Sequence, residues 1–178
     1  MPDISLYDHL KLTAGISSCI DQYLREKGIS DYQTELFVNG KDFYDKEVFQ
    51  LCTLDVSGIQ KFIYTISTKN ALRMLRARSF YLDMMMEHLI DELLGKEGLS
   101  RTNLIYAGGG HCYLLIPNTN MASDIFDRFL QETNEWFLEN FGTALYIAGA
   151  RAATSANSLK NIPDGSYSEI FRKLSSEL

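Results

Sequence analysis

The chain has 178 residues, a formal net charge of −6, and 46% hydrophobic and 22% charged residues. This length predicts one domain with a short appendage, and the composition is that of a globular protein with a sizeable core. The acidic balance excludes binding of nucleic acid by overall charge, so only a local basic patch remains for such a contact.

The first helix is predicted from Ser5 to Lys27, where apolar residues recur at helical spacing and Gly28 follows as a C-cap. Ser5 and Asp8 form a variant of the capping box. His9 lies beside Asp8, and imidazole and carboxylate groups are both metal ligands. Two adjacent residues supply at most two ligands, so a solvated or capping role is the main alternative to metal binding here.

Residues 31–47 predict a linker, because polar residues interrupt its short apolar pieces. The Asn39-Gly40 dipeptide is a strong turn signal. We therefore expect a small hairpin in which Leu36 to Val38 pairs with Phe43 and Tyr44.

The next apolar run, Val48 to Val56, predicts a central strand with Asp55 at its C-terminal end. Ser57 and Gly58 follow, and Ile59 to Ile66 predicts a short helix. A carboxylate at this place suits Mg²⁺ beside phosphates, and the backbone N–H groups of residues 57–60 would face an anion. The alternative is that Asp55 or Ser57 only caps the helix.

A long helix is predicted from about Asn70 to Gly95. Lys69, Arg73 and Arg76 share one face at its start. Because the planar guanidinium group suits phosphate, this stripe is a candidate phosphate or RNA contact, and a solvated face is the alternative.

Between Asn103 and Pro117, two apolar runs flank Gly108, Gly109 and Gly110, which predicts a β-hairpin. A turn needs positive φ at only one or two positions. The third glycine leaves a tip without any Cβ atom, which another molecule's backbone, phosphate or base can approach closely. The alternative is a tip that is merely permissive.

A helix from Met121 to Phe141 follows, capped by Thr119 or Asn120, then a strand from Ala144 to Ala153, a loop over 157–165 and a helix from Tyr167. The order strand–helix–strand–strand–helix–strand predicts an α+β, ferredoxin-like fold, a four-stranded antiparallel sheet with helices on one face. In this topology Asp55 and the glycine turn meet at one edge. The pocket so formed suits a nucleoside triphosphate.

Cys19, Cys52 and Cys112 are scattered within apolar runs and show no CxxC spacing, which predicts reduced core thiols rather than a zinc site. No apolar run reaches membrane-spanning length, and the N-terminus lacks the pattern of a signal peptide. We expect a cytoplasmic protein without a membrane contact.

Three separate motifs resemble a known family, and together with their surroundings they cover nearly the whole chain. They are the segments Leu54 to Ile63, Leu72 to Leu82 and Asn103 to Asn118. They resemble the first palm domain, a cyclase- and polymerase-like domain, in the large subunit of type III CRISPR effector complexes of the Csm kind.

The resemblance implies a larger subunit for antiviral defence, with an HD nuclease domain, two palm domains and a zinc-bearing domain. Such a subunit makes cyclic oligoadenylates from ATP with Mg²⁺ or Mn²⁺. Its partners would be the other subunits of the effector complex, guide and target RNA, and, within the same subunit, the second palm domain. The chain would then be a piece of that subunit: 1–30 closes a permuted HD-type domain, 31–47 is a linker, 48–156 is the palm, and 157–178 begins the next segment.

The resemblance also implies roles for single residues. The positions that match a nucleotide-binding half-site are Ser57, Gly58, Ile59, Gln60, Phe62, Gly108, Gly109 and Gly110. His9 matches a metal-binding histidine of the HD domain, and Asp55 matches a metal position of the palm. The family's catalytic turn carries two acids after two glycines, whereas this chain has Gly110 and His111 there. The resemblance therefore implies a non-catalytic palm that holds ATP against the second palm; a scaffold or RNA-contacting module that binds no nucleotide is the alternative.

Overall fold

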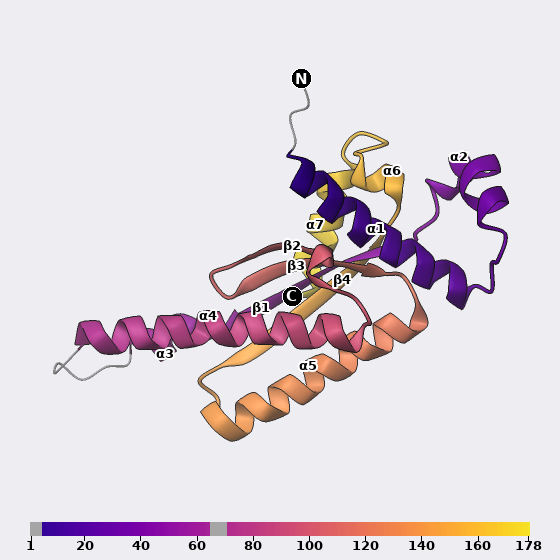
Figure 1. The fold of residues 1–178 in the computed structure, drawn as a ribbon. Helices are drawn as coiled ribbons and strands as arrows, with labels where there is room; N and C mark the ends of the chain where they lie inside the picture. Colours follow the sequence, from indigo (N-terminus) through magenta and orange to yellow (C-terminus); the bar gives the residue numbers. More distant parts are fainter. Residues whose placement is uncertain (1–4, 65–70) are drawn as a thin grey trace.

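The computed structural model describes residues 5–64 and 71–178 (Figure 1). Its strands are β1 (Phe49–Ser57), β2 (Leu104–Gly108), β3 (His111–Pro117) and β4 (Tyr146–Thr154). Its helices are α1 (Leu6–Glu26), α2 (Gly40–Phe43), α3 (Ile59–Tyr64), α4 (Ala71–Lys96), α5 (Asn120–Phe141), α6 (Ala156–Leu159) and α7 (Ser166–Glu177), with a π-helical turn at Thr34–Val38 and a 3₁₀ turn at Arg101–Asn103. Within these ranges no helix combines the length and apolarity that a bilayer span requires.

The four strands form one antiparallel sheet in the order β2-β3-β1-β4. The predicted α+β fold is confirmed. The chain passes from β1 through α4 to β2 and from β3 through α5 to β4, so α4 and α5 are the two crossover helices. β1 is central and pairs on both sides, with Asp55 opposite His111 on β3 and Ala148 on β4. The C-terminal end of β1 therefore lies beside the β2–β3 hairpin.

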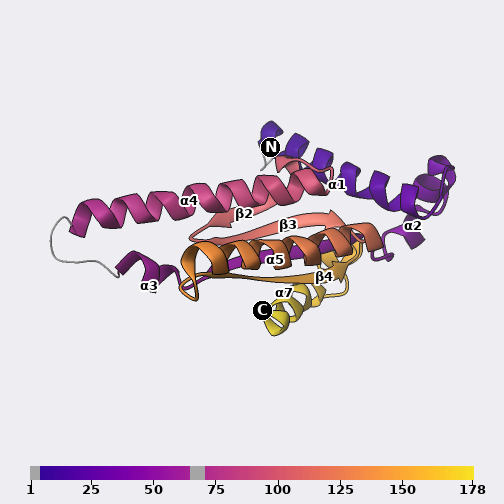
Figure 2. The same ribbon diagram turned by 90° about the horizontal axis from the view of Figure 1, so that it is seen from below.

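One face of the sheet is covered by the two long helices, α4 and α5, as Figure 2 shows from the helix side. Alternate β1 residues, Cys52, Leu54 and Val56, point into this layer. They join a core that includes Ile90 and Leu93 of α4 and Phe126, Phe129 and Phe137 of α5, all 1% exposed or less. Burial of these large apolar side chains is the main source of the fold's stability.

The opposite face is covered at one end by α1 and α7, which the sequence analysis did not foresee (Figure 1). Leu51 of β1 packs with Ile170 and Leu174 of α7, whereas Phe49 and Leu115 pack with Cys19 and Leu24 of α1. The other end of this face, towards Asp55 and the hairpin, lies beyond these two clusters. The site described below occupies that end.

The predicted helix caps are confirmed by their hydrogen bonds. The Ser5 hydroxyl accepts from the backbone N–H of Asp8 at 3.1 Å and donates to its carboxylate at 2.6 Å. Thr119 accepts from the N–H of Ala122 at 3.1 Å, and Gly142 ends α5 with a φ of +58°. These positions end helices for local reasons, which is why sequence alone located them.

The predicted hairpin between Leu36 and Tyr44 is wrong. Thr34–Val38 forms a π-helical turn and Gly40–Phe43 the short helix α2, with Asn39 as its N-cap. An isolated two-stranded hairpin is marginal in water. Phe43 is the only buried residue of this segment. Helical turns bury Phe43 as well as a hairpin would, and they satisfy their own backbone hydrogen-bonding groups.

Two smaller boundaries also differ from expectation. The predicted loop over 157–165 contains α6, which begins at Ala156 because the Ser155 hydroxyl accepts from the N–H of Ser158. β4 begins at Tyr146, two residues later than predicted, since Ala144 still belongs to the turn after α5.

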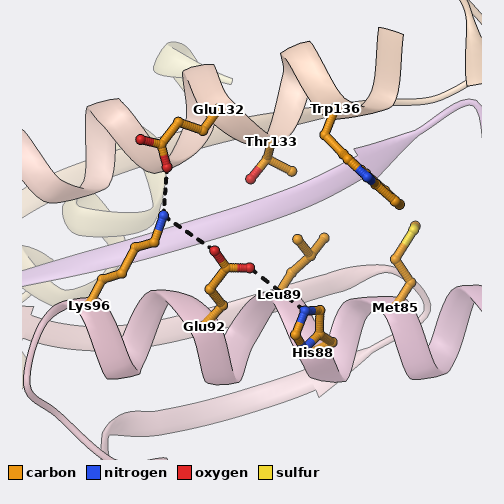
Figure 3. Close-up of a pocket in the computed structure, with 8 residues that line it drawn as sticks. All are labelled: Met85, His88, Leu89, Glu92, Lys96, Glu132, Thr133 and Trp136. Carbon is orange, nitrogen blue, oxygen red and sulfur yellow. Dashed lines mark hydrogen bonds and ion pairs between the residues drawn. The ribbon is translucent and has the colours of Figure 1, made fainter. Parts of the chain in front are cut away.

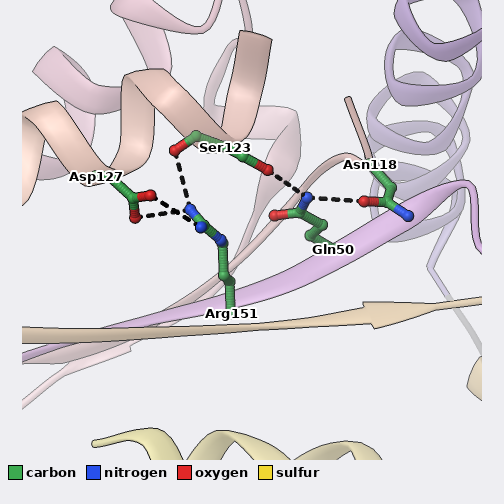
Figure 4. Close-up of polar contacts among 5 residues, drawn as sticks. All are labelled: Gln50, Asn118, Ser123, Asp127 and Arg151. Atoms are coloured by element: carbon green, nitrogen blue, oxygen red, sulfur yellow. Dashed lines mark hydrogen bonds and ion pairs between the residues drawn. The ribbon is translucent and has the colours of Figure 1, made fainter. Parts of the chain in front are cut away.

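Polar side chains lie between α5 and the sheet (Figure 4). Arg151 of β4 binds both carboxylate oxygens of Asp127, at 2.7 and 2.9 Å, and donates to the Ser123 carbonyl. Gln50 of β1 donates to the side chains of Asn118 and Ser123. These bonds tie β1, β4 and the start of α5 together at the end of the sheet away from the hairpin.

Candidate functional site

The end of β1 and the glycine turn meet, as predicted. Asp55 and His111 are direct cross-strand partners, and the Val56 N–H donates to the Gly110 carbonyl at 2.8 Å. The turn also rests on α3, because a Cβ on Gly110 would lie 2.2 Å from the Ile59 side chain. The strand end, the start of α3 and the hairpin tip therefore lie next to one another.

A row of polar side chains runs from β1 to β3. Thr53, Asp55 and Ser57 alternate along β1 and so share the face away from α4 and α5. His111 lies between the first two: its Nε2 is 3.2 Å from the Thr53 hydroxyl and its Nδ1 is 3.4 Å from Asp55 Oδ1. The Ser57 hydroxyl makes a long hydrogen bond of 3.5 Å to Asp55 Oδ2.

The three glycines of the turn have different reasons to be glycine. Gly109 and Gly110 have positive φ, +63° and +84°, the geometry of a tight hairpin. A Cβ on Gly108 would lie 2.7 Å from the Tyr106 hydroxyl, whereas a Cβ on Gly109 would have no atom within 4 Å from the described residues beyond its two chain neighbours. The hairpin geometry accounts for glycine at both positions of positive φ, and of the three it is Gly109 whose surroundings leave room for another molecule.

Gly58 connects β1 to α3 and is required by the fold itself. Its φ is +89°, and a Cβ there would lie 2.0 Å from the Ala144 carbonyl oxygen. The chain crosses over the turn that leads into β4 at this point. The glycine is therefore accounted for by this crossing.

Aromatic side chains border the polar row. Tyr106 and Tyr146 are 54% and 56% exposed, and Tyr113 packs edge-on against His111 with 4.7 Å between ring centroids. Tyr113 also lines an apolar hollow of about 460 Å³ between α1 and α7, together with Ile16, Ile105 and Phe171 among others. Polar groups at the strand end and aromatic rings beside them can hold a ligand that has both an anionic and a flat apolar part.

Residues 48–178 match the family model described as Csm1 subunit domain B. The chain belongs to the Csm1 family. It is 50% identical to the CRISPR system single-strand-specific deoxyribonuclease Cas10/Csm1 (subtype III-A) of Mycobacterium tuberculosis, over 99% of this chain and 23% of that protein. The chain thus spans about a quarter of the length of this curated Csm1 relative.

Solved Csm1 structures have the same fold. A Csm1–Csm4 subcomplex in the type III-A CRISPR-Csm interference complex is 29% identical with a TM-score of 0.78, covering 98% of this chain and 23% of the other. A Csm1–Csm4 cassette in complex with AMPPNP is 29% identical with a TM-score of 0.75, over the same shares of both chains. Csm1 in those structures is assembled with Csm4.

Among the described residues of this Csm1 segment, the other predicted site residues are not members of the polar row. Gln60 is exposed at the start of α3. Phe62 lies in the helix layer, where it packs edge-on against Phe141 at 5.7 Å, beneath the Arg78 guanidinium. His9 is exposed on α1. Arg73 and Arg76 line a shallow hollow at the start of α4, and Lys69 lies outside the described residues.

The residues at the strand end do not fit a divalent metal ion. Mg²⁺ takes oxygen ligands in octahedral geometry, supplied in proteins by carboxylates, phosphates and water. Asp55 is the only acid of the row, and both its oxygens are in contact with His111 and Ser57. Over residues 5–64 and 71–178, no three histidine, cysteine or acidic side chains are grouped to hold a metal ion.

Another hollow, of about 310 Å³, lies between α4 and α5 on the helix side (Figure 3). At one end Lys96 bridges Glu92 and Glu132, at 3.3 and 2.6 Å. Met85 and Trp136 lie at the other end. Exposed ion pairs of this kind contribute little stability. None of the predicted site residues reaches this hollow.

The sequence did not lead us to include Thr53 and Tyr113 in the site. His111 was considered only as the position where the family's catalytic turn has an acid. The signal was present, because Thr53, Asp55 and Ser57 alternate with apolar residues. A period of two at a strand end places polar residues together on one face. Reading the strand as continuously apolar concealed that pattern.

Proposed function

We propose that the chain forms part of a type III CRISPR large subunit and contributes a non-catalytic ATP-binding half-site for cyclic oligoadenylate synthesis in antiviral defence. The observation that carries this proposal is the bare backbone of Gly109 beside the polar row at the end of β1. A ligand's phosphates can approach there without meeting a side chain. The AMPPNP complex of the Csm1 relative supports the ligand class.

The half-site would act by positioning rather than by chemistry. Attack on an α-phosphate needs metal ions held by acids, and the hairpin carries Gly110 and His111 in their place. We therefore assign Mg²⁺ or Mn²⁺ to the second palm domain of the parent subunit. This chain would present ATP to that domain, with the triphosphate at the strand end and the base towards the tyrosines.

The test is to measure ATP binding after a side chain has been placed at the tip of the glycine turn. Gly109→Asn adds a side chain where nothing lies within 4 Å, and asparagine tolerates the left-handed φ of +63°. Gly28→Asn is a matched control, since Gly28 has a φ of +67°, equally open surroundings and a place at the far end of α1. By calorimetry we expect at least a tenfold loss of affinity for Gly109→Asn and none for Gly28→Asn. Equal affinities of both folded variants would refute the half-site.

A second candidate function, contact with RNA in the effector complex, is favoured by Arg73 and Arg76. Both are exposed on one face of α4, and neither forms an ion pair within the described part of the chain. By contrast Arg25, Arg101 and Arg172 each bind a carboxylate. Guanidinium groups that have no ion-pair partner among the described residues remain available for phosphate.

We expect Arg73→Ala with Arg76→Ala to weaken binding of a single-stranded RNA oligomer and to reduce the salt dependence of that binding. Removal of two phosphate contacts lowers the slope of log K against log salt by about 1.4. Arg25→Ala with Arg172→Ala removes the same charge from two ion pairs elsewhere and is the control. Fluorescence anisotropy over a salt series measures both; equal slopes for the two double variants would rule out a local contact.

A further inference from the structure

The imidazole of His111 contacts the side chains of Asp55, Thr53 and Tyr113. The two residues face each other across the central strands, and their side chains meet at 3.4 Å. The other ring nitrogen of His111 meets the hydroxyl of Thr53, which is fully buried. With Tyr113 packed on its ring, the imidazole is held from three sides and cannot turn away from the carboxylate without losing these contacts.

Both carboxylate oxygens of Asp55 have contacts within the protein. His111 Nδ1 lies 3.4 Å from Oδ1 and the Ser57 hydroxyl donates to Oδ2 at 3.5 Å, so a polar group of the protein lies beside each oxygen. A bare carboxylate at this place would repel a phosphate, because two negative charges a few ångströms apart interact strongly at a partly buried site. The imidazole held beside Asp55 offsets part of that repulsion.

We propose that His111 takes the place of a divalent metal ion beside Asp55, so that nucleotide phosphates bind this sheet face without a metal on Asp55. The nucleotide part rests on the proposed function, whereas the absence of a metal on Asp55 does not depend on it. Asp55 then serves to position His111, and the imidazole beside the carboxylate weakens its repulsion of the phosphates. Thr53 fixes the imidazole from behind.

Replacement of Asp55 distinguishes a carboxylate that positions His111 from one that binds a metal ion, because the two roles predict different changes in the affinity for ATP. Asp55→Asn keeps the size of the side chain and an oxygen that can face His111, but removes the charge. We expect its affinity for ATP to stay within threefold of the parent or to rise, and the parent's affinity to stay within threefold when EDTA replaces Mg²⁺. A metal ligand at residue 55 would give the opposite result, a loss of at least tenfold in both comparisons, and would overturn the proposal.

His111→Asp tests the proposal without any nucleotide. It places a second carboxylate directly opposite Asp55, where cross-strand Cβ atoms lie about 5 Å apart. Two facing carboxylates suit Mn²⁺, which the electron paramagnetic resonance signal of the free ion reports. We expect His111→Asp to bind Mn²⁺ at least tenfold more tightly than the parent. His111→Asn, which removes the imidazole without adding a charge, should bind it no more tightly than the parent.

The outcomes of these experiments can be told apart. Mn²⁺ binding by the parent as tight as by His111→Asp would overturn the present proposal and leave the ATP half-site standing. A parent chain that binds no ATP would refute the half-site, and the Mn²⁺ comparison would still decide what His111 does. Circular dichroism of each variant confirms that the comparison is between folded proteins.

Discussion

The chain is expected to lose about 2–3 kcal/mol of stability between pH 6 and 8.5, and Glu97→Gln is expected to abolish most of that loss. Glu97 is 2% exposed, and neither of its carboxylate oxygens has a hydrogen-bond partner among the described residues. Burial raises its pKa from 4.5 to about 8, although the charge of Arg151 acts to lower it. The folded protein therefore favours the neutral acid.

Stability falls as the pH rises because the pKa of Glu97 is higher in the folded chain than in the unfolded chain. The unfolded chain releases this proton near pH 4.5 and the folded chain only near pH 8, so folding is progressively opposed between these values. Below pH 4.5 the carboxyl group is neutral in both states and the penalty vanishes. Each pH unit inside the window costs at most about 1.4 kcal/mol.

Urea denaturation at a series of pH values measures this effect. Glu97→Gln should be more stable than the parent at pH 8.5, and its stability should change less across the window. Glu132→Gln is the control, since Glu132 is half exposed and its pKa is lowered by Lys96. An unchanged pH dependence in Glu97→Gln would contradict the assignment.

Gly58→Ala is expected to destabilise the fold by about 3–4 kcal/mol. Two costs combine: the left-handed φ of +89° and a Cβ that would lie 2.0 Å from the Ala144 carbonyl oxygen. Because that oxygen belongs to the backbone, the turn into β4 has to move. Thermal unfolding of Gly109→Ala gives the comparison, since it has the φ cost alone, about 1–2 kcal/mol.

The destabilisation of Gly58→Ala limits what the ATP affinity of this variant can reveal. A loss of ATP affinity in Gly58→Ala would follow from displacement of β4 and α3, so it would say nothing about direct contact with ligand. If Gly58→Ala and Gly109→Ala had equal melting temperatures, the close crossing at Ala144 would be wrong.

Much of the fold follows from local patterns in the sequence. The helix ends at Ser5, Thr119 and Gly142 were predictable because caps depend on a few neighbouring residues. The sheet order followed from the alternation of strands and long helices. The turns around Phe43 were not predictable, because Phe43 is buried in a cluster with Phe49 and Leu115 that the local sequence does not reveal.

The site was predictable in position and less so in composition. The meeting of Asp55 with the glycine turn follows from topology. That Phe62 belongs to the helix layer, and that Gly58 serves a backbone crossing, depends on α5 and Ala144, far away in the sequence. A motif shared with a family marks such residues without distinguishing those that touch a ligand from those that hold the fold.

The distribution of charge along α4 has a consequence for how the molecule meets its partners. The arginines 73, 76 and 78 lie in its first turns, and its acids, Asp83, Glu87, Asp91 and Glu92, all follow them. Over 26 residues, about 39 Å, this separation makes the helix a permanent electric dipole. A polyanion that diffuses towards the molecule is therefore turned towards the arginine end before any contact forms. Salt weakens this orienting torque, because the field is screened within about 10 Å at 0.1 M.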